Sequence, residues 1–359
     1  MSVAVLALLP VILGVSGCAF AKSGPPGARS GTSPASRSRT PAPQRSSGGG
    51  SGGPVVPGTH LRCPGRPTHR VSSAAELTSA LATAAPGETI TLAPGTYAGN
   101  FVARSSGRPT APITLCGSRA AVLAGGNVRH GYVFYLDHAS WWRLDGFTVE
   151  DGQKGVVTDY ATHDLIYGLY VHSIGDEAIH LRSFSSDDVV SHCVIRHAGL
   201  LVTFFGEGIY VGSAHSNWCE YTHCQPDASD NDTIVGNNIA QTTAENIDIK
   251  EGTTGGLIED NHFDGAGMVA SAATAWVNVK GNDWTISGNK GTESVGDGFQ
   301  VHQVYPGWGI GNKFIGNHAN VNGPGYGIYV QSSHLKTILA CDNVATKAKS
   351  GLSNQHCSG

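Results

Sequence analysis

The chain has 359 residues, of which 14% are charged and 49 are glycine. This low charge and high glycine content are unusual for an ordinary globular domain and suit a repetitive fold with a turn at every corner. Residues 61–359 carry 18 of the 23 basic residues and all 27 acidic residues, a formal charge of −9. The acidity of this region argues against nucleic acid as a partner. A polyanionic substrate would need a cation to mediate its binding.

Residues 1–18 are expected to form an export signal. The apolar stretch from Val3 to Val15 is too short to span a bilayer and fits the core of a signal peptide. Val15-Ser16-Gly17-Cys18 resembles the lipobox of bacterial lipoproteins, which implies that Cys18 is lipidated. The alternative is an ordinary signal peptide cut nearby. Either way we expect an extracellular protein, secreted or held at the cell surface, that meets the membrane only through this anchor.

Residues 19–60 are expected to be a disordered linker. They are rich in Ser, Gly, Pro and Arg and have few large apolar side chains, so they cannot bury enough surface to fold. The folded domain is therefore predicted to occupy residues 61–359.

Eight cysteines in an exported chain favour disulfides. Lipidation of Cys18 would leave seven, so at least one is free. The expected pairs are Cys219–Cys224, Cys341–Cys357 and Cys63–Cys116. Cys193 is then left over and is expected to be buried and inert.

A helix is predicted over residues 73–85. Ser73 and Glu76 have the spacing of a capping box, and Leu77, Leu81 and Ala84 follow on one face. We expect this helix to cap the N-terminal end of the fold.

Short strands of one type recur along the rest of the chain. Each begins with a small or flat residue and then alternates apolar with polar residues, which gives one buried and one wet face. The strands are residues 155–159, 178–182, 208–212, 246–250, 276–280, 298–302 and 327–331. Such a strand cannot cover its own apolar face, but stacking on its neighbours at ~4.8 Å would make one continuous core.

A second repeat places Asn237, Asn261, Asn289 and Asn317 after short apolar strands. Stacked at one corner, each amide can bond to the next. They could form a binding row, but an internal asparagine ladder is the preferred interpretation.

These features predict an all-β fold, a single-stranded right-handed parallel β-helix with an N-terminal capping helix, expected to be a monomer. The predicted helix, the opening Pro86-Gly87-x-x-Ile90-x-Leu92-x-Pro94-Gly95-x-Tyr97 and the coils after it resemble the parallel β-helix polysaccharide lyases. The resemblance covers roughly residues 70–345. It implies the fold directly and the chemistry less directly, because this architecture also carries hydrolases, epimerases and adhesins.

Aligning the strands places their outward side chains in columns. One column holds Val157, His180, Tyr210, Asp248, Asn278, Gln300 and Tyr329. The next holds Asp159, Arg182, Gly212, Lys250, Lys280, His302 and Gln331. The strands are preceded by Lys154, Glu177, Glu207, Glu245, Ala275, Asp297 and Tyr326. A slip of one residue would turn all of these groups inward.

The middle coils hold the densest charge. Glu207, Glu245, Asp248 and Asp297 are the candidate metal ligands, and with Asn278 such an oxygen set suits calcium. Lys250 and Lys280 would lie one coil apart, so the pKa of one of them should fall, and a partly neutral lysine can act as a base.

β-Elimination on a uronic acid needs these parts, because a cation on the substrate carboxylate stabilises the charge that develops when the C5 proton leaves. The resemblance to the lyases implies Lys250 as the base, with Lys280 or His302 as acid or as a partner of the substrate carboxylate. Glu245-x-x-Asp248-x-Lys250 matches no full signature of one lyase family. The candidate substrate-binding residues are Arg182, His180, Tyr210, Asn278, Gln300, Trp218, Tyr305 and Trp308.

Trp218, Tyr305 and Trp308 come from two insertions that leave the same edge of the strand ladder and could wall the groove, since sugars stack on aromatic faces. Packing on the coil beneath is the alternative. In the first insertion, His215, Cys219, His223 and Cys224 could also suggest zinc, although a disulfide is preferred in an exported protein.

The leading hypothesis is a calcium-assisted lyase for an acidic polysaccharide. A glycoside hydrolase would instead pair Glu245 or Asp248 with Asp297. A third possibility is a carbohydrate-binding β-helix without catalysis.

Overall fold

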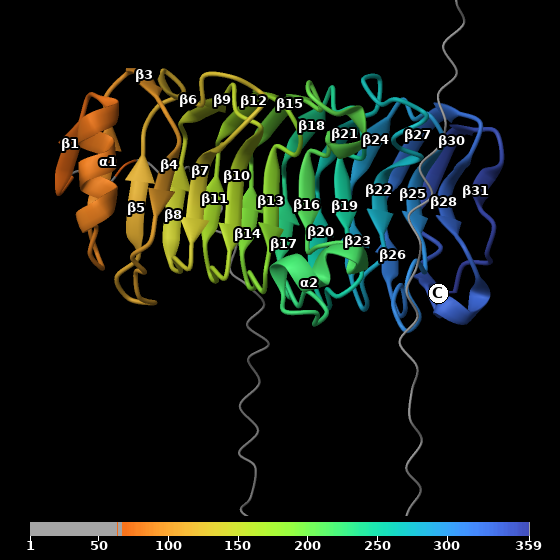
Figure 1. Ribbon diagram of the computed structural model, residues 1–359. Coiled ribbons are helices and arrows are strands. Elements are labelled where there is room, and N and C mark those ends of the chain that lie inside the picture. The colour runs from red at the N-terminus through yellow and green to blue at the C-terminus, as the bar shows by residue number, and fades with distance from the viewer. Residues whose placement is uncertain (1–62, 64–66, 359) are drawn as a thin grey trace, which may run out of the picture. The chain divides into compact units, whose positions relative to one another are not determined.

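This computed structural model describes Cys63 and residues 67–358, and within them the chain is a parallel β-helix (Figure 1). Each full coil contributes one strand to each of three parallel sheets, called A, B and C here. The colours of Figure 1 run steadily from orange to blue along one axis, so the coils stack in chain order. The predicted all-β parallel β-helix is confirmed.

Sheet A contains β1 (His69–Val71), β2 (Thr89–Leu92), β5 (Ile113–Cys116), β8 (Trp142–Asp145), β11 (Leu165–Tyr167), β14 (Val189–Ser191), β17 (Thr233–Val235), β20 (Leu257–Glu259), β23 (Thr285–Ser287), β26 (Lys313–Ile315) and β29 (Ile338–Leu339). Sheet B contains β3 (Gly95–Ala98), β6 (Ala121–Ala124), β9 (Thr148–Glu150), β12 (Tyr170–Ile174), β15 (Val194–Ala198), β18 (Asn238–Ala240), β21 (His262–Asp264), β24 (Lys290–Thr292), β27 (His318–Gly323) and β30 (Val344–Ala348).

Sheet C contains β4 (Phe101–Ala103), β7 (Tyr132–Asp137), β10 (Lys154–Asp159), β13 (Ile179–Arg182), β16 (Ile209–Val211), β19 (Ile247–Ile249), β22 (Ala275–Val279), β25 (Asp297–Val301), β28 (Tyr326–Val330) and β31 (Gly351–Ser353). The helical segments are α1 (Ala74–Thr83), α2 (Trp218–Tyr221) and the 3₁₀ turns η1 (Thr203–Phe205), η2 (His215–Asn217) and η3 (Ser333–Leu335).

Helix α1 lies within the segment predicted to be helical. The Ser73 side chain accepts a hydrogen bond from the Glu76 backbone at 3.3 Å, as expected for an N-cap. Leu77 and Leu81 are buried, and the helix packs beside β1, β3 and β4 at the N-terminal end of the coils.

Sheet C has the register that the alternation predicted. Val157 pairs with His180, His180 with Tyr210, and Tyr210 with Asp248. The same column continues from Asp248 through Asn278 and Gln300 to Tyr329. The polar positions therefore point away from the core, while the alternate apolar residues fill it.

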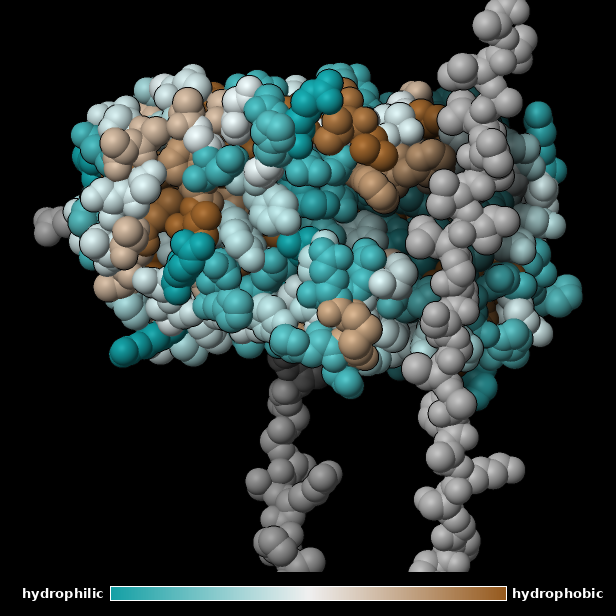
Figure 2. Space-filling model, in the orientation of Figure 1, coloured by the Kyte–Doolittle hydropathy of each residue, from teal (hydrophilic) through white to brown (hydrophobic). Residues whose placement is uncertain are grey.

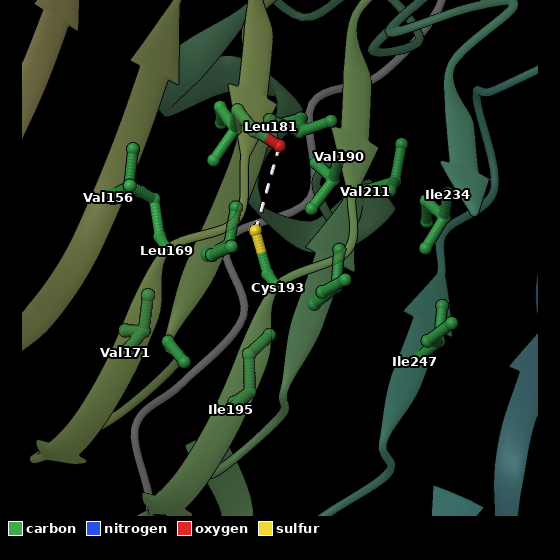
Figure 3. Close-up of a cluster of buried hydrophobic side chains, with 14 of the residues drawn as sticks. Val156, Leu169, Val171, Leu181, Val190, Cys193, Ile195, Val211, Ile234 and Ile247 are labelled. Carbon is green, nitrogen blue, oxygen red and sulfur yellow. Dashed lines mark hydrogen bonds between the residues drawn. The ribbon is translucent and has the colours of Figure 1, made fainter. Parts of the chain in front are cut away.

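The apolar core runs through the stacked coils (Figure 3). Aliphatic residues of neighbouring coils stack on one another in layers, as Val156 does on Ile179 and Leu181 on Val211. Cys193 lies fully buried among them, as predicted, and burial raises the pKa of its thiol to about 12. A buried thiol that stays protonated is a poor nucleophile, which agrees with the expectation that it is inert.

The asparagine corner is an internal ladder. Asn237, Asn261 and Asn289 are completely buried, and the side-chain oxygens of Asn261 and Asn289 accept from the backbone and the amide of the preceding member. The Asn237 oxygen accepts from the backbone of Cys193. The ladder continues through Asn317 to Asn343, which was not predicted. These amides satisfy one another inside the fold, so they are not a binding row.

The predicted disulfides Cys63–Cys116, Cys219–Cys224 and Cys341–Cys357 are all present. The Cys219–Cys224 bond removes the cysteine ligands that a zinc site in this insertion would need. The predicted signal segment 1–18 with Cys18, and the linker 19–60, lie outside the described residues. In the described part of the chain, no helix has the length and apolar character needed to cross a membrane.

Candidate functional site

A groove of about 550 Å³ lies on the outward face of sheet C over β10, β13, β16 and β19. His180, Arg182, Glu207, Tyr210 and Lys250 are the predicted site residues that line it. One wall comes from the segments that lead into the strands and includes Phe204 and Phe205. The opposite wall follows the strand ends and is formed by the insertion that carries η2 and α2, visible below sheet C in Figure 1.

Three buried carboxylates meet beside this groove. Glu207, Glu245 and Asp248 each offer an oxygen atom, and these atoms lie within 4.8 Å of one another. Oε2 of Glu207 is buried and has no hydrogen-bond partner. Burial raises the pKa of Glu207 well above its usual value, and the nearby charges of Glu177, Asp248 and Glu245 raise it further. Burial and Asp248 likewise raise the pKa of Glu245.

Lys250 and Lys280 lie on the outward side of sheet C, as predicted, and both bind the same carboxylate. Nζ of Lys250 is 2.8 Å from Oδ2 of Asp248, and Lys280 binds Oδ1. Burial lowers the pKa of Lys250, but the Asp248 carboxylate, together with Tyr210 and Glu207, outweighs burial and holds this pKa well above the usual value. The expectation of a lowered lysine pKa is therefore wrong for Lys250, because an anion lies between the two ammonium groups.

Tyr210 lies beneath Lys250. The ammonium nitrogen is 4.8 Å from the centre of the Tyr210 ring, within the range of a cation–π contact. Burial raises the pKa of Tyr210 well above its ordinary value, so its hydroxyl stays protonated and can donate a proton or a hydrogen bond. His180 stacks edge-on against this ring, and burial together with Lys154 and Arg182 holds its pKa well below the usual value.

The N-terminal end of the groove is made of paired charges. Arg182 binds both oxygens of Asp159 at 2.7 and 3.1 Å, and its guanidinium lies over the rings of Tyr132 and Tyr221. Lys154 binds Glu177. Arg182 is thus held in place by its neighbours and presents a fixed, fully paired cation.

The remaining strand residues that were predicted for the site lie outside the groove lining in two hydrogen-bonded groups, one of which reaches Glu245. Asn278 donates to Oε1 of Glu245 at 3.2 Å, and its oxygen lies 3.0 Å from Nδ1 of His302. Burial and Lys280 lower the pKa of His302. Gln300 donates to Asp297 at 2.6 Å and accepts from Thr274, so Asp297 binds its own neighbours rather than joining the three clustered carboxylates.

The two insertions pack against each other. Trp218 lies in this contact and is not part of a surface that could bind a sugar. The Trp218 indole is buried, donates to the Ser213 carbonyl at 3.0 Å and packs edge-on against Tyr305 at 5.3 Å. Tyr305 remains exposed and Trp308 is half-buried. The alternative of loop packing therefore describes Trp218 correctly.

Sequence reasoning missed the aromatic residues that line the groove itself. Phe204 and Phe205 precede β16, and Tyr132 lies against the Arg182 guanidinium. The available signal was the Phe-Phe pair in the loop between Gly199 and Gly206, because an exposed apolar patch often marks a binding site.

The chain is similar to solved polysaccharide-acting enzymes. A crystal structure of an alginate lyase from Paenibacillus sp. str. FPU-7 matches with 34% identity and a TM-score of 0.75, over 81% of this chain and 100% of that one. Pectate lyase Pel9A matches with 16% identity and a TM-score of 0.58, over 82% of each chain. A mannuronic acid specific polysaccharide family 6 lyase from human gut microbiota matches with 12% identity and a TM-score of 0.52, over 81% of this chain and 78% of that one.

Neither the family models nor the curated proteins contain a match. The matches at 16% and 12% identity show only that the fold is shared. The Paenibacillus enzyme is similar in sequence along its whole length, and its fold carries the same stacked coils. The chain therefore belongs to the parallel β-helix polysaccharide lyases.

Proposed function

We propose that this lyase cleaves an acidic, uronate-containing polysaccharide by β-elimination in the groove over β13, β16 and β19, outside the cytoplasm. Alginate is the first substrate to test, because the relative with 34% identity is an alginate lyase. The observation that carries the proposal is the outward-facing cluster in which Asp248 binds Lys250 and Lys280 beside the carboxylates of Glu207 and Glu245. Disulfides in the described part of the chain support an oxidising location.

The donor set fits a calcium ion. Three carboxylates offer oxygens within 4.8 Å, and Oε2 of Glu207 has no partner in the protein. Both ammonium groups bind Asp248, so among the described residues Glu207 and Glu245 are the carboxylates of the cluster without an ion pair to a lysine. When bound there, calcium would supply positive charge to the substrate carboxylate as the C5 carbon loses its proton.

Lys250 and Tyr210 are the groups of this chain that we assign to proton transfer. They share the groove floor and lie in contact. Lys250 would take the C5 proton at Nζ, in the fraction of molecules whose amine is neutral, and the electron pair would expel the oxygen at C4. The Tyr210 hydroxyl, which stays protonated, would donate its proton to that oxygen. Asp248 holds the Lys250 amine in position, and Lys280 binds the other oxygen of the same carboxylate.

The test is the absorbance of the unsaturated product at ultraviolet wavelengths, on alginate, pectate, glucuronan and glycosaminoglycans, with and without a chelator. We expect product from at least one polymer, loss of activity by at least about a hundredfold in Lys250→Ala, and a marked fall with chelator. Lys290→Ala, at an exposed lysine on sheet B, is the matched control and should keep full activity.

The assay also separates the alternatives. New reducing ends without unsaturation would indicate a hydrolase, and binding without product would indicate a carbohydrate-binding protein. Either result would contradict the proposal. Undiminished activity in chelator would contradict the role of calcium alone.

A further inference from the structure

Phe204 and Phe205 form an exposed aromatic pair on the groove wall. Their exposed fractions are 55% and 53%, although burying a phenylalanine side chain stabilises a fold by roughly 1.5–3 kcal/mol. In the view of Figure 2, hydrophobic surface appears at the upper edge and at the left of the visible face, with mostly polar surface between them. The pair thus gives up folding stability at a place where a ligand could cover it.

The loop that carries the pair is held closed at its base. Leu201 donates to the Gly175 carbonyl at 2.7 Å, and the Thr243 hydroxyl donates to the Thr203 carbonyl at 2.9 Å. Gly199 has a φ of +87°, and a Cβ atom there would lie 1.7 Å from Oγ1 of Thr243. These contacts fix the backbone, so little conformational entropy is lost when a ligand packs on the rings.

The pair lines the same groove as the proposed reacting groups. Phe205 is two residues before Glu207, and both line the cavity with Tyr210 and Lys250. Phe204 and Phe205 stand on the wall opposite Asn217 and Tyr221. A chain lying along the groove would therefore touch the phenyl rings with one face while its polar edge meets the charged floor.

We propose that Phe204 and Phe205 form an aromatic subsite that stacks on a pyranose ring of the polysaccharide, beside the sugar that reacts. This inference rests on the proposed function. A uronate ring has a C–H face without charge and an edge that carries hydroxyl and carboxylate groups, and a phenyl ring offers a flat apolar surface only to the first. The subsite is selective for ring face and chain length rather than for the carboxylate.

The mixed charge of the lining favours a sugar over an anionic membrane as the occupant. Asp176, Glu177 and Glu207 line the groove together with Lys154, Arg182 and Lys250. A lining without an excess of positive charge gives an anionic lipid surface no net attraction, whereas its charged groups can bind the hydroxyl and carboxylate groups of a sugar.

The experiment compares Phe204→Ala, Phe205→Ala and the double variant with Leu200→Ala. Leu200 lies on the same loop and is equally exposed, at 54%, but is not part of the groove lining. We expect the double variant to raise KM for the polymer about tenfold with little change in kcat, because a stacking contact binds substrate and transition state alike. The Leu200 variant and the thermal midpoints should stay unchanged, and Phe205→Trp should keep the wild-type KM.

Chain length gives a second readout. Short oligosaccharides that do not reach the subsite should show the same KM in the wild type and the double variant. An unchanged KM for the polymer in the double variant would overturn the subsite. If the wild type makes no unsaturated product at all, the proposed function fails separately. The subsite would then be tested by electrophoresis of the protein in gels that contain alginate. Equal retardation of the wild type and the double variant would also overturn the subsite.

Discussion

Asp248 receives two ammonium groups, one from its own strand end and one from the next coil. The two bonds outweigh the effect of burial and hold the pKa of Asp248 below its usual value. Glu207 has no such partner, and its unbonded oxygen makes it the least compensated member of the cluster. At the residue scale, Glu207 is therefore the group with most to gain from a bound cation.

We expect Glu207→Gln to remove the response of the protein to calcium. Because burial and neighbouring charges raise the pKa of Glu207, the folded state resists its ionisation, so stability is lost as pH rises through that pKa. Without calcium, the variant should unfold at a higher temperature than the wild type near pH 8. With calcium at a hundred times its dissociation constant, the wild type should gain about 2.7 kcal/mol and the variant much less.

Thermal unfolding in chelator and in calcium measures both effects. Glu293→Gln, at an exposed carboxylate that binds Asn322, is the control and should respond to calcium like the wild type. An equal calcium response in Glu207→Gln would rule out Glu207 as a ligand.

At the scale of elements, two buried ladders run through the coils. In the asparagine ladder every amide both donates and accepts. A second ladder has Asp164, Asp188 and Asp232 at equivalent places before strands of sheet A, where each accepts a backbone N–H from the preceding coil. The other oxygen of each aspartate is buried without a partner. Burial, and for Asp164 and Asp232 also the neighbouring Asp188, raise their pKa values well above the usual one.

We expect Asp188→Asn to stabilise the fold, and more so at higher pH. The folded state holds its proton more tightly than the unfolded chain, so wild-type stability falls as pH rises above about 4. An asparagine keeps the accepting oxygen and has no charge. The gain should be small near pH 4 and reach about 1–3 kcal/mol at pH 8.5.

Urea unfolding at the two pH values measures this difference. The reverse exchange, Asn261→Asp, should destabilise by a similar amount at pH 8.5, because it removes an amide that donates to the Ile234 carbonyl and to Asn289. A gain in the free energy of unfolding of Asp188→Asn that does not depend on pH would contradict a raised pKa of Asp188 as its cause.

At the scale of the whole described domain, each strand pairs only with the strands of the coils beside it, and longer contacts such as Trp218 with Tyr305 come from side chains and loops. Such a solenoid has no single centre, and its stability is the sum of coils and their interfaces. The groove lies over β10 to β19, whereas the Cys341–Cys357 disulfide joins the last coils, several repeats away. Loss of this disulfide should therefore affect the last coils and leave the groove unchanged.

We expect the double substitution Cys341→Ser and Cys357→Ser to loosen the last coil without loss of activity. Opening a loop of this length costs about 3 kcal/mol, which falls on β29, β30 and β31. Hydrogen exchange should rise over residues 338–358 and stay unchanged over β13 to β19, with the same kcat/KM. A parallel fall in activity would show that the coils are coupled over the length of the solenoid.

The sequence by itself determined the coils and their register, whereas the disulfide pairs that it suggested were established by the structure. Alternation with period two can bury only one face of a strand, so the column from His180 through Tyr210 and Asp248 followed without any coordinates. The stacked asparagines followed for the same reason, since a repeat at one corner places like residues in contact. The cluster of Glu207, Glu245 and Asp248 was predicted from this register.

Only the tertiary structure decided the charge state and the walls of the groove. The pKa of Lys250 depends on whether Asp248 lies between the two lysines or beside them. These two arrangements differ by a few ångströms, which the spacing of the residues in the sequence does not define. The insertion with Trp218 and the loop with Phe204 and Phe205 have no repeat to constrain them, so it was their packing that buried Trp218 and left the two phenylalanines exposed. In the periodic segments, the repeat itself determines which residues lie side by side. The packing of loops and the pKa values of charged groups depend instead on distances set by the whole fold.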